Sequence, residues 1–213
     1  LIEVNHMQAH LLVNFIDDNA VDKPCFPFLG INISGGHTQI VICKNFFEME
    51  VIGETLDDSI GEAFDKCGKV IGLDYPAGPK IDKLAKNGDP KKFKFSIPQV
   101  KGLNFSFSKI KTNFKRFIES KILENKSFIE KEKENIRSSL QQTITKILLN
   151  KIIKAIKQTK TKNIVFGGGV SANSKIRESC RKELKNYNLF FPKIEYTTDN
   201  AAMIAIVGYL KYK

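Results

Sequence analysis

The sequence predicts an α/β protein with a mixed sheet, and three observations support this fold class. A strand–turn–strand pattern stands near the start of the chain, at 26–43. Strands alternate with helices near its end, at 163–209, and a long helical stretch lies between the two regions. The first pattern indicates antiparallel pairing and the second indicates parallel pairing, so one sheet containing both is mixed.

Two short apolar runs rich in β-branched residues, Phe26–Ile33 and Gln39–Cys43, predict the hairpin, with the sequence SGGHT at its tip. A third strand is expected over Phe47–Gly53. A helix is expected over Ser59–Ile71, because apolar residues recur there at helical spacing and charged residues fall on the opposite face.

The second half of the chain begins with a Pro/Gly segment, Tyr75–Pro79, and an expected short helix over Lys80–Asn87. Residues 88–106 are expected to form an irregular connection. A long Lys-rich helix is expected over Ser127–Thr159, where Ile or Leu recurs every four residues. The remaining elements are expected to be a strand at Asn163–Phe166, a helix at Asn173–Leu184, a strand at Leu189–Phe191 and a last helix from near Asp199 towards Tyr209.

Composition excludes several classes of protein. The 213 residues are 42% hydrophobic and 27% charged, which is ordinary for a folded chain and excludes a disordered tail, a collagen-like repeat or a small disulfide scaffold. No run of eighteen apolar residues occurs, so no membrane span is expected. The four cysteines lie far apart without a CxxC pair, which is typical of buried, reduced thiols in a cytosolic protein. Because Leu1 opens inside sequence that looks structured, we expect the start of the protein to be missing.

The net charge of +11 is concentrated in one segment. Twelve basic residues stand against three acidic ones between Lys80 and Lys121, a net of +9. This excess favours a polyanionic partner. AT-rich coding, which enriches Lys, Ile and Asn throughout a protein, explains the excess equally well.

Two of the three histidines, His6 and His10, are four residues apart. On a helix this spacing places both imidazoles on one face and makes half of a metal site. Two histidines satisfied within a helix are the commoner outcome of such spacing. Zincin proteases need Glu directly after the first His, and Met7 stands there. A metal at this position would therefore orient a substrate and would not activate water for proteolysis.

Two glycine segments could bind a ligand through the backbone. Gly35 and Gly36, at the hairpin tip, allow close approach of an anionic oxygen, although a tight turn needs glycine anyway. Gly167–Gly169 follow a strand and lead into a helix whose N-terminus favours negative charge. This segment is neither GxGxxG nor a P-loop, and a glycine-rich helix entry without a ligand is the alternative.

Two carboxylates, Asp65 and Asp199, are further candidates. Asp65 is expected on the polar face of a helix, where a solvated carboxylate is the plain interpretation. For Asp199, a helix N-cap would be explanation enough.

Seven segments, taken in order, resemble one family. They are HMQAH at 6–10, SGGHTQ at 34–39, EAFDK at 62–66, YPAGP at 75–79, FSFS at 105–108, GGGVSAN at 167–173 and TTDNAAM at 197–203. The chain resembles the tRNA N6-adenosine threonylcarbamoyltransferases of the TsaD, or glycoprotease-like, family, whose counterpart is the catalytic subunit of KEOPS. Departures from the family pattern at Asn32, Ala77 and Lys109 remove no ligand.

The resemblance implies an actin-like ATPase fold of the Hsp70/sugar-kinase class. Residues 1–213 would form a single region of this two-lobed fold, lacking part of the N-terminal lobe. It implies transfer of the threonylcarbamoyl group from threonylcarbamoyl-AMP to N6 of adenosine 37 in tRNAs that read ANN codons. A catalytically idle nucleotide-binding or scaffold protein of the same fold is the alternative. A metalloprotease is disfavoured by the missing Glu, and a sugar kinase has no role for HxxxH.

Carried over residue by residue, the resemblance also implies a site. One divalent metal, Fe²⁺ or Zn²⁺, would be held by His6, His10 and Asp199. No general base can be assigned. The substrate-binding residues would be Asn32, Ile33, Ser34, Gly35, Gly36, Asp65, Gly78, Asp82 and Asn173.

The implied partners follow from the same resemblance. The basic, partly irregular segment Lys80–Lys121 would hold tRNA through its phosphates, so that binding weakens steeply with salt. Accessory proteins of the TsaB and TsaE type would assist, as in bacteria. No membrane is involved, and the expected location is the cytoplasm.

Overall fold

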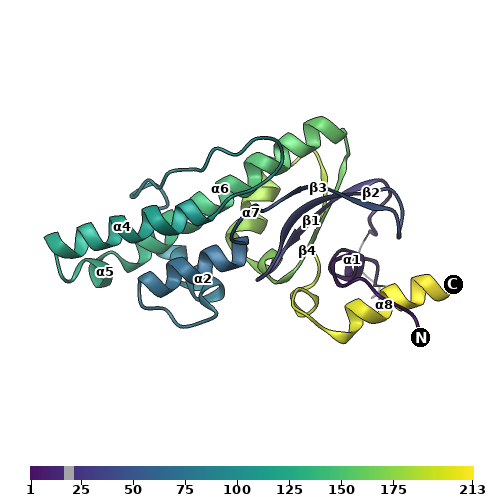
Figure 1. Cartoon of the computed structure of the whole chain (residues 1–213), viewed down its shortest axis with the longest axis horizontal. Helices are drawn as coiled ribbons and strands as arrows, with labels where there is room; N and C mark the ends of the chain where they lie inside the picture. The colour runs from purple at the N-terminus through teal and green to yellow at the C-terminus, as the bar shows by residue number, and fades with distance from the viewer. Residues whose placement is uncertain (17–21) are drawn as a thin grey trace.

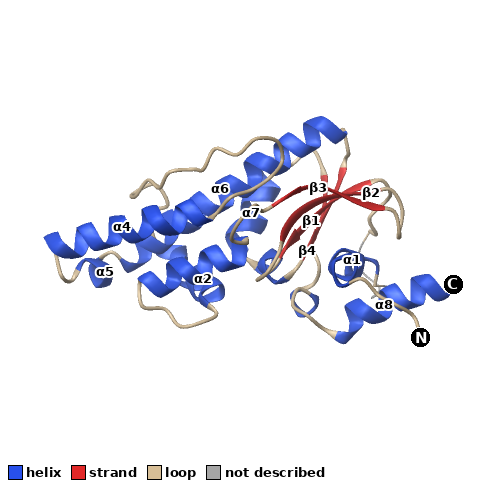
Figure 2. Ribbon diagram, viewed as in Figure 1, coloured by secondary structure: helices blue, strands red, loops and turns tan. Residues whose placement is uncertain are grey.

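A five-stranded mixed sheet organises the chain, in the order β3-β2-β1-β4-β5 (Figure 2). The computed structural model describes residues 1–16 and 22–213. β1 (Phe28–Ile33), β2 (Thr38–Cys43) and β3 (Met49–Glu54) pair antiparallel, whereas β4 (Asn163–Gly167) and β5 (Asn188–Phe190) continue the sheet parallel to β1. The predicted mixed sheet is therefore confirmed.

Helices cover both faces of the sheet (Figure 1). β1 is buried along its whole length, because its alternate side chains face opposite layers. Leu29 and Ile31 pack in the large core that includes α6, whereas Phe28 packs with Leu11 of α1 on the other face. The helices are α1 (His6–Leu12), α2 (Ile60–Val70), α3 (Ala77–Leu84), α4 (Ser108–Glu124), α5 (Phe128–Lys131), α6 (Lys133–Thr159), α7 (Ser174–Glu183) and α8 (Ala201–Tyr212). Short 3₁₀ turns occupy Val13–Phe15, Ala85–Asn87, Gly169–Ala172 and Ile194–Tyr196.

The long helix α6 confirms its predicted apolar stripe. Ile136, Leu140, Ile144, Leu148 and Ile152 are all fully buried. The predicted helix over Ser127–Thr159 is nevertheless two helices, because the chain breaks helical geometry at Glu132, between α5 and α6.

Helix α4 is an element that the sequence analysis does not predict. Its buried face is narrow, with Ile110, Phe114 and Ile118 set among lysines. Its start is held from a distant part of the chain by Asp57, whose carboxylate accepts hydrogen bonds from Ser106 Oγ (2.6 Å) and from the N–H groups of Phe107 (2.7 Å) and Ser108 (3.2 Å). Burial raises the pKa of Asp57, but these hydrogen bonds outweigh it and lower the pKa below its usual value.

The cysteines divide into two groups. Cys43, Cys67 and Cys180 are free and buried, as predicted, and burial raises the pKa of each thiol to about 12. Cys25 is exposed, so the prediction of a buried thiol is wrong there. Among the described residues, no helix is both long and apolar enough to cross a membrane.

Candidate functional site

His6, His10 and Asp199 lie together where α1 meets the start of α8. Asn5 caps α1, its side chain accepting from the N–H groups of Met7 and Gln8, so both imidazoles stand on one helical face. The Nε2 atoms of His6 and His10 lie 3.5 and 3.2 Å from Oδ1 of Asp199. One potential ligand atom from each residue falls within 4.8 Å of the other two.

The alternative role for Asp199, capping the last helix, belongs to its neighbour. Asn200 is the N-cap of α8, and its Oδ1 accepts from the Met203 N–H at 2.9 Å. Asp199 is 75% exposed and is left free to face the two histidines.

The electrostatics of His10 favour a neutral imidazole. The side chain is only 2% exposed, and its burial, followed by the nearby His6, lowers the pKa of His10 below its usual value. Neutral imidazole is the form that binds metals. Nδ1 of His10 is buried and has no hydrogen-bond partner among the described residues.

These three residues fit a divalent transition metal. Ligands at about 2.0–2.1 Å from such an ion lie roughly 3 to 3.5 Å from each other, which matches the two histidine–carboxylate distances. Imidazole and carboxylate donors suit both iron and zinc. Three protein ligands would also leave a coordination position for a substrate oxygen.

The hairpin tip between β1 and β2 supplies unused backbone donors. Its turn is closed by the Ser34 N–H donating to the His37 carbonyl (2.9 Å) and by the His37 N–H donating to Ser34 Oγ (3.1 Å). Within the described parts of the chain, no hydrogen bond uses the N–H of Gly35 or Gly36. An added Cβ on either glycine would meet nothing within 4 Å, so this backbone is open to a ligand.

Helix α2 holds the hairpin tip in place. A Cβ on Gly61, in the first turn of α2, would lie 2.6 Å from the Gly35 Cα, so the two backbones pack directly on each other. Ser59 Oγ donates to the Gly35 carbonyl, and the Ile60 N–H donates to Thr38 Oγ1 at 2.8 Å. Sequence reasoning misses Gly61, because only its distant partner reveals why glycine is needed.

The glycine run at 167–169 serves packing more than ligand contact. A Cβ on Gly167 would lie 2.3 Å from the His10 carbonyl oxygen, and one on Gly168 would lie 2.4 Å from the Ile33 carbonyl oxygen. Gly168 also has a φ of +87°, which favours glycine. Only Gly169 lines the cleft described next, so one of the three predicted glycines faces a possible ligand.

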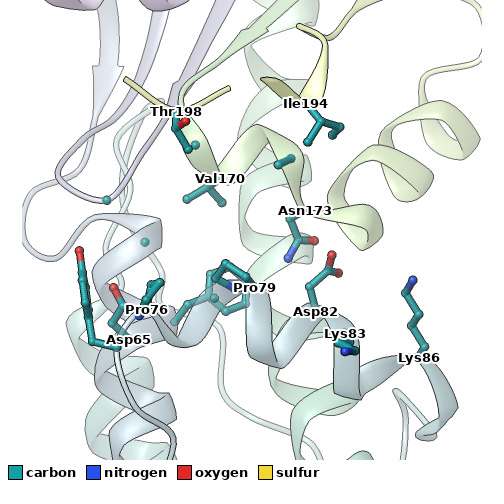
Figure 3. A pocket seen from close by; sticks show the side chains of 17 residues that line it. Asp65, Pro76, Pro79, Asp82, Lys83, Lys86, Val170, Asn173, Ile194 and Thr198 are labelled. Atoms are coloured by element: carbon teal, nitrogen blue, oxygen red, sulfur yellow. The ribbon is translucent and has the colours of Figure 1, made fainter. Parts of the chain in front are cut away.

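A cleft of about 500 Å³ lies between α2 and α3 on one side and the segments at 169–173 and 194–198 on the other (Figure 3). Its lower wall in the picture comes from α2 and α3, with Asp65, Pro79 and Asp82. Val170 and Thr198 stand on the facing wall. Thr198 directly precedes Asp199 in the chain, so this wall of the cleft is joined through the backbone to the possible metal site.

Asp65 is not the solvated carboxylate of the plain interpretation. Its Oδ1 accepts from the Ala77 N–H at 2.7 Å, so it holds the first turn of α3. This bond explains why α3 begins at Ala77, three residues before the predicted helix start at Lys80. A carboxylate has about four lone-pair sites, so Asp65 can still accept from a ligand hydroxyl.

Asp82 and Asn173 belong to a network that sequence reasoning only partly found. Asp82 accepts from Gln141 Nε2 (2.6 Å), Ser174 Oγ (2.8 Å) and the Ser174 N–H (2.9 Å). Asn173 Oδ1 accepts from the Ile176 N–H and from Gln141, at 3.0 and 3.1 Å. Gln141 therefore orients both candidates, and no signal in the helical pattern of α6 distinguishes it from its neighbours.

The structure brings only part of the implied substrate site together. Gly35, Asp65, Gly78, Asp82 and Asn173 line the cleft.

The other four implied residues do not line it. Asn32 and Ile33 are buried within β1, and Asn32 Nδ2 donates to the Met7 carbonyl (3.0 Å), joining β1 to α1. Ser34 and Gly36 belong to the hairpin turn beside Gly35.

The basic side chains of the segment Lys80–Lys121 are exposed or half-buried and lie on α3, the following connection and α4. Lys92 pairs with Glu132 at 2.8 Å. Lys83 and Lys86 line the cleft, and neither forms an ion pair within the described residues.

Comparison with known proteins gives one consistent result. A family model described as "TsaD: tRNA N6-adenosine threonylcarbamoyltransferase" matches residues 1–206. Proteins named tRNA N6-adenosine threonylcarbamoyltransferase from Christiangramia forsetii and Riemerella anatipestifer are 54% and 49% identical to this chain over its whole length. One from Thermosipho africanus is 44% identical. The chain spans about 63% of the length of each of these relatives.

Solved structures agree on the fold. Full-length HypF in its phosphate- and nucleotide-bound form matches all of this chain and 36% of its own, with a TM-score of 0.69 and 14% identity. Component A of the Acidaminococcus fermentans (R)-2-hydroxyglutaryl-CoA dehydratase matches 96% of this chain and 68% of its own, with a TM-score of 0.52 and 15% identity. At such identities the likeness concerns the fold alone, which is the actin-like ATPase fold that the resemblance implies.

Proposed function

Because this chain belongs to the tRNA N6-adenosine threonylcarbamoyltransferase family, we propose that the protein transfers a threonylcarbamoyl group to tRNA. The donor would be threonylcarbamoyl-AMP and the acceptor N6 of adenosine 37 in tRNAs that read ANN codons. The observation that carries this proposal is the presence of the His6–His10–Asp199 cluster together with a cleft large enough for a nucleotide, whose lining residue Thr198 directly precedes Asp199.

We propose that His6, His10 and Asp199 hold one Fe²⁺ or Zn²⁺ ion. When bound, the metal would supply a Lewis acid that polarises an oxygen of the threonylcarbamoyl-adenylate. The chain itself binds and orients the adenylate. The free N–H groups of Gly35 and Gly36 suit its phosphate oxygens, and the carboxylate of Asp65 suits its ribose hydroxyls.

In the reaction, N6 of the adenine forms a bond to the carbamoyl carbon, and the bond from that carbon to the phosphate oxygen breaks. AMP leaves with the electron pair of that bond, and N6 loses a proton. No residue of the cleft is assigned as the base that takes this proton. Holding the two reactants together in one cleft supplies part of the rate enhancement through proximity.

The proposed partners are tRNA, bound through Lys80–Lys121, and accessory proteins of the TsaB and TsaE type. We place the reaction in the cytoplasm.

The test is transfer of labelled threonine to tRNA in the presence of the accessory proteins. We expect label in the tRNA with the unaltered protein, and none with a variant carrying both His6→Ala and His10→Ala. Metal analysis of the same preparations should show about one ion per chain in the first and a deficit in the second. Circular dichroism should show that the variant keeps its helices. Absence of label with the unaltered protein, in a mixture where a relative is active, would favour the idle nucleotide-binding or scaffold alternative.

A further inference from the structure

Tyr75 stands on the rim of the cleft with its ring almost wholly in solvent. It lines the cleft together with Asp65 and Gly78, yet it is 82% exposed. No aromatic neighbour packs against it within the described residues. A single exposed apolar side chain is normal on a protein surface. The position of Tyr75, at the rim of this cleft, is what sets it apart.

The backbone beneath Tyr75 is held firmly. The loop leaving α2 is closed by the Gly72 N–H donating to the Lys69 carbonyl and the Leu73 N–H donating to the Gly68 carbonyl. On the other side, the Ala77 N–H is bound to Asp65. A ring on a firm base loses little conformational entropy when a ligand stacks on it, so it can contribute its full contact energy to binding.

Two lysines lie on the same wall as Tyr75, beside and beyond Asp82. Lys83 and Lys86 lie further along α3 and the turn that follows it, and both line the cleft (Figure 3). Neither is neutralised by a carboxylate among the described residues. An exposed aromatic ring and lysines without an ion pair, lining one cleft, form a combination that binds unpaired nucleic acid, where bases stack on the ring and phosphates meet the cations.

We propose that Tyr75 stacks on an unpaired base of the RNA substrate at the entrance to the cleft. This inference rests on the proposed function and adds a positioning residue to it. We assign the base to the RNA and not to the adenylate because Tyr75, 82% exposed at the rim, can be reached by a second molecule from outside the cleft. Stacking would help bring the acceptor adenine from outside towards a donor that is already bound inside.

The protein contains no tryptophan, so Tyr75→Trp introduces a single fluorescent reporter at the rim. The matched control is Tyr209→Trp, which places the reporter at an exposed tyrosine of α8. Each variant is titrated with AMP, with a stem-loop RNA carrying unpaired adenosines, and with a fully paired RNA of equal length. We expect the stem-loop alone to change the emission of the reporter at 75, and no comparable change at 209.

A binding series completes the experiment. Tyr75→Ala should weaken stem-loop binding by about tenfold, the effect of losing one base–aromatic stack, whereas Tyr75→Phe should retain the affinity. AMP affinity should be the same in all three proteins.

Several results would overturn the inference. Emission at position 75 that responds to AMP would assign the ring to the adenylate. An equal emission change with paired RNA would show that the contact is electrostatic and involves no stacking on an unpaired base. If Tyr75→Ala leaves RNA binding unaffected, the role of Tyr75 is refuted, but the proposed tRNA substrate is not. Normal AMP binding with no RNA binding by the unaltered protein would refute both this inference and the proposed tRNA substrate.

Discussion

Replacing Gly61 with alanine tests whether α2 holds the hairpin tip in its binding position. The new Cβ would lie 2.6 Å from both the Gly35 Cα and the Ser34 carbonyl oxygen. Ordinary contact begins near 3.4 Å, so the hairpin tip must move by about 0.8 Å. These opposing atoms are backbone, and rotating a side chain cannot relieve the contact.

Two effects of opposite sign determine how much Gly61→Ala changes the free energy of unfolding. Overpacking typically costs about 1–3 kcal/mol. Alanine gains at most about 1 kcal/mol over glycine from helix propensity. The net expectation is a loss of about 1–2 kcal/mol in the free energy of unfolding. For a chain of this size, that loss lowers the melting temperature by roughly 2–8 °C.

The control is Gly208→Ala, in the middle of α8, where an added Cβ meets nothing within 4 Å. It makes the same replacement without the contact and should stabilise the protein by about 0.5–1 kcal/mol. Thermal unfolding of both variants measures the difference between them.

Calorimetric titration with AMP measures the consequence for the site. Gly61→Ala should weaken AMP binding by about tenfold, because displacement of the hairpin tip by this amount misplaces the Gly35 and Gly36 donors. If Gly61→Ala has the same melting temperature as the unaltered protein and binds AMP equally well, the packing of α2 on the hairpin does not control the site.

Three further predictions concern stability and RNA binding. Asp57→Ala should cost about 1–2 kcal/mol at neutral pH, because the start of α4 loses its acceptor. The pKa of Asp57 is lowered on folding, so this advantage of the unaltered protein should be present above pH ~4 and shrink as pH falls through the lowered pKa; a gap in urea stability that is constant with pH would contradict this. Changing Lys91, Lys92 and Lys94 together to Ser should reduce the salt slope of tRNA binding by about 1.5, since Lys92 is already ion-paired and two free charges are lost; an unchanged slope would support the coding-bias explanation. Thr145→Val should raise the urea midpoint by the equivalent of about 1 kcal/mol, because the Thr145 hydroxyl is buried without a described partner, and a lower midpoint would show that it has one.

Local patterns were sufficient to predict much of the fold. The hairpin, α2 and the buried stripe of α6 each follow from spacing within a few residues. The spacing of His6 and His10 likewise fixes both on one helical face, because helical geometry alone relates residues four apart.

Elements whose stability depends on distant residues were missed or shifted. Helix α4 is anchored by Asp57, 50 residues before Phe107, and its own apolar spacing is diluted by lysines. The start of α3 depends on Asp65, 12 residues earlier. No window of sequence contains both partners of such a bond.

The sequence by itself determined which chemical groups this protein possesses: imidazoles at helical spacing, glycines at turns, and carboxylates beside them. Only the tertiary structure decided what each group does. It brought Asp199 within 3.2 Å of His10, gave the capping role to Asn200, and placed Gln141 between Asp82 and Asn173. It also used Gly167 and Gly168 for packing and left Gly35 and Gly36 open. The reason is physical: hydrogen bonds and close contacts act over about 3 Å, and the path of the folded chain alone decides which distant residues come that near.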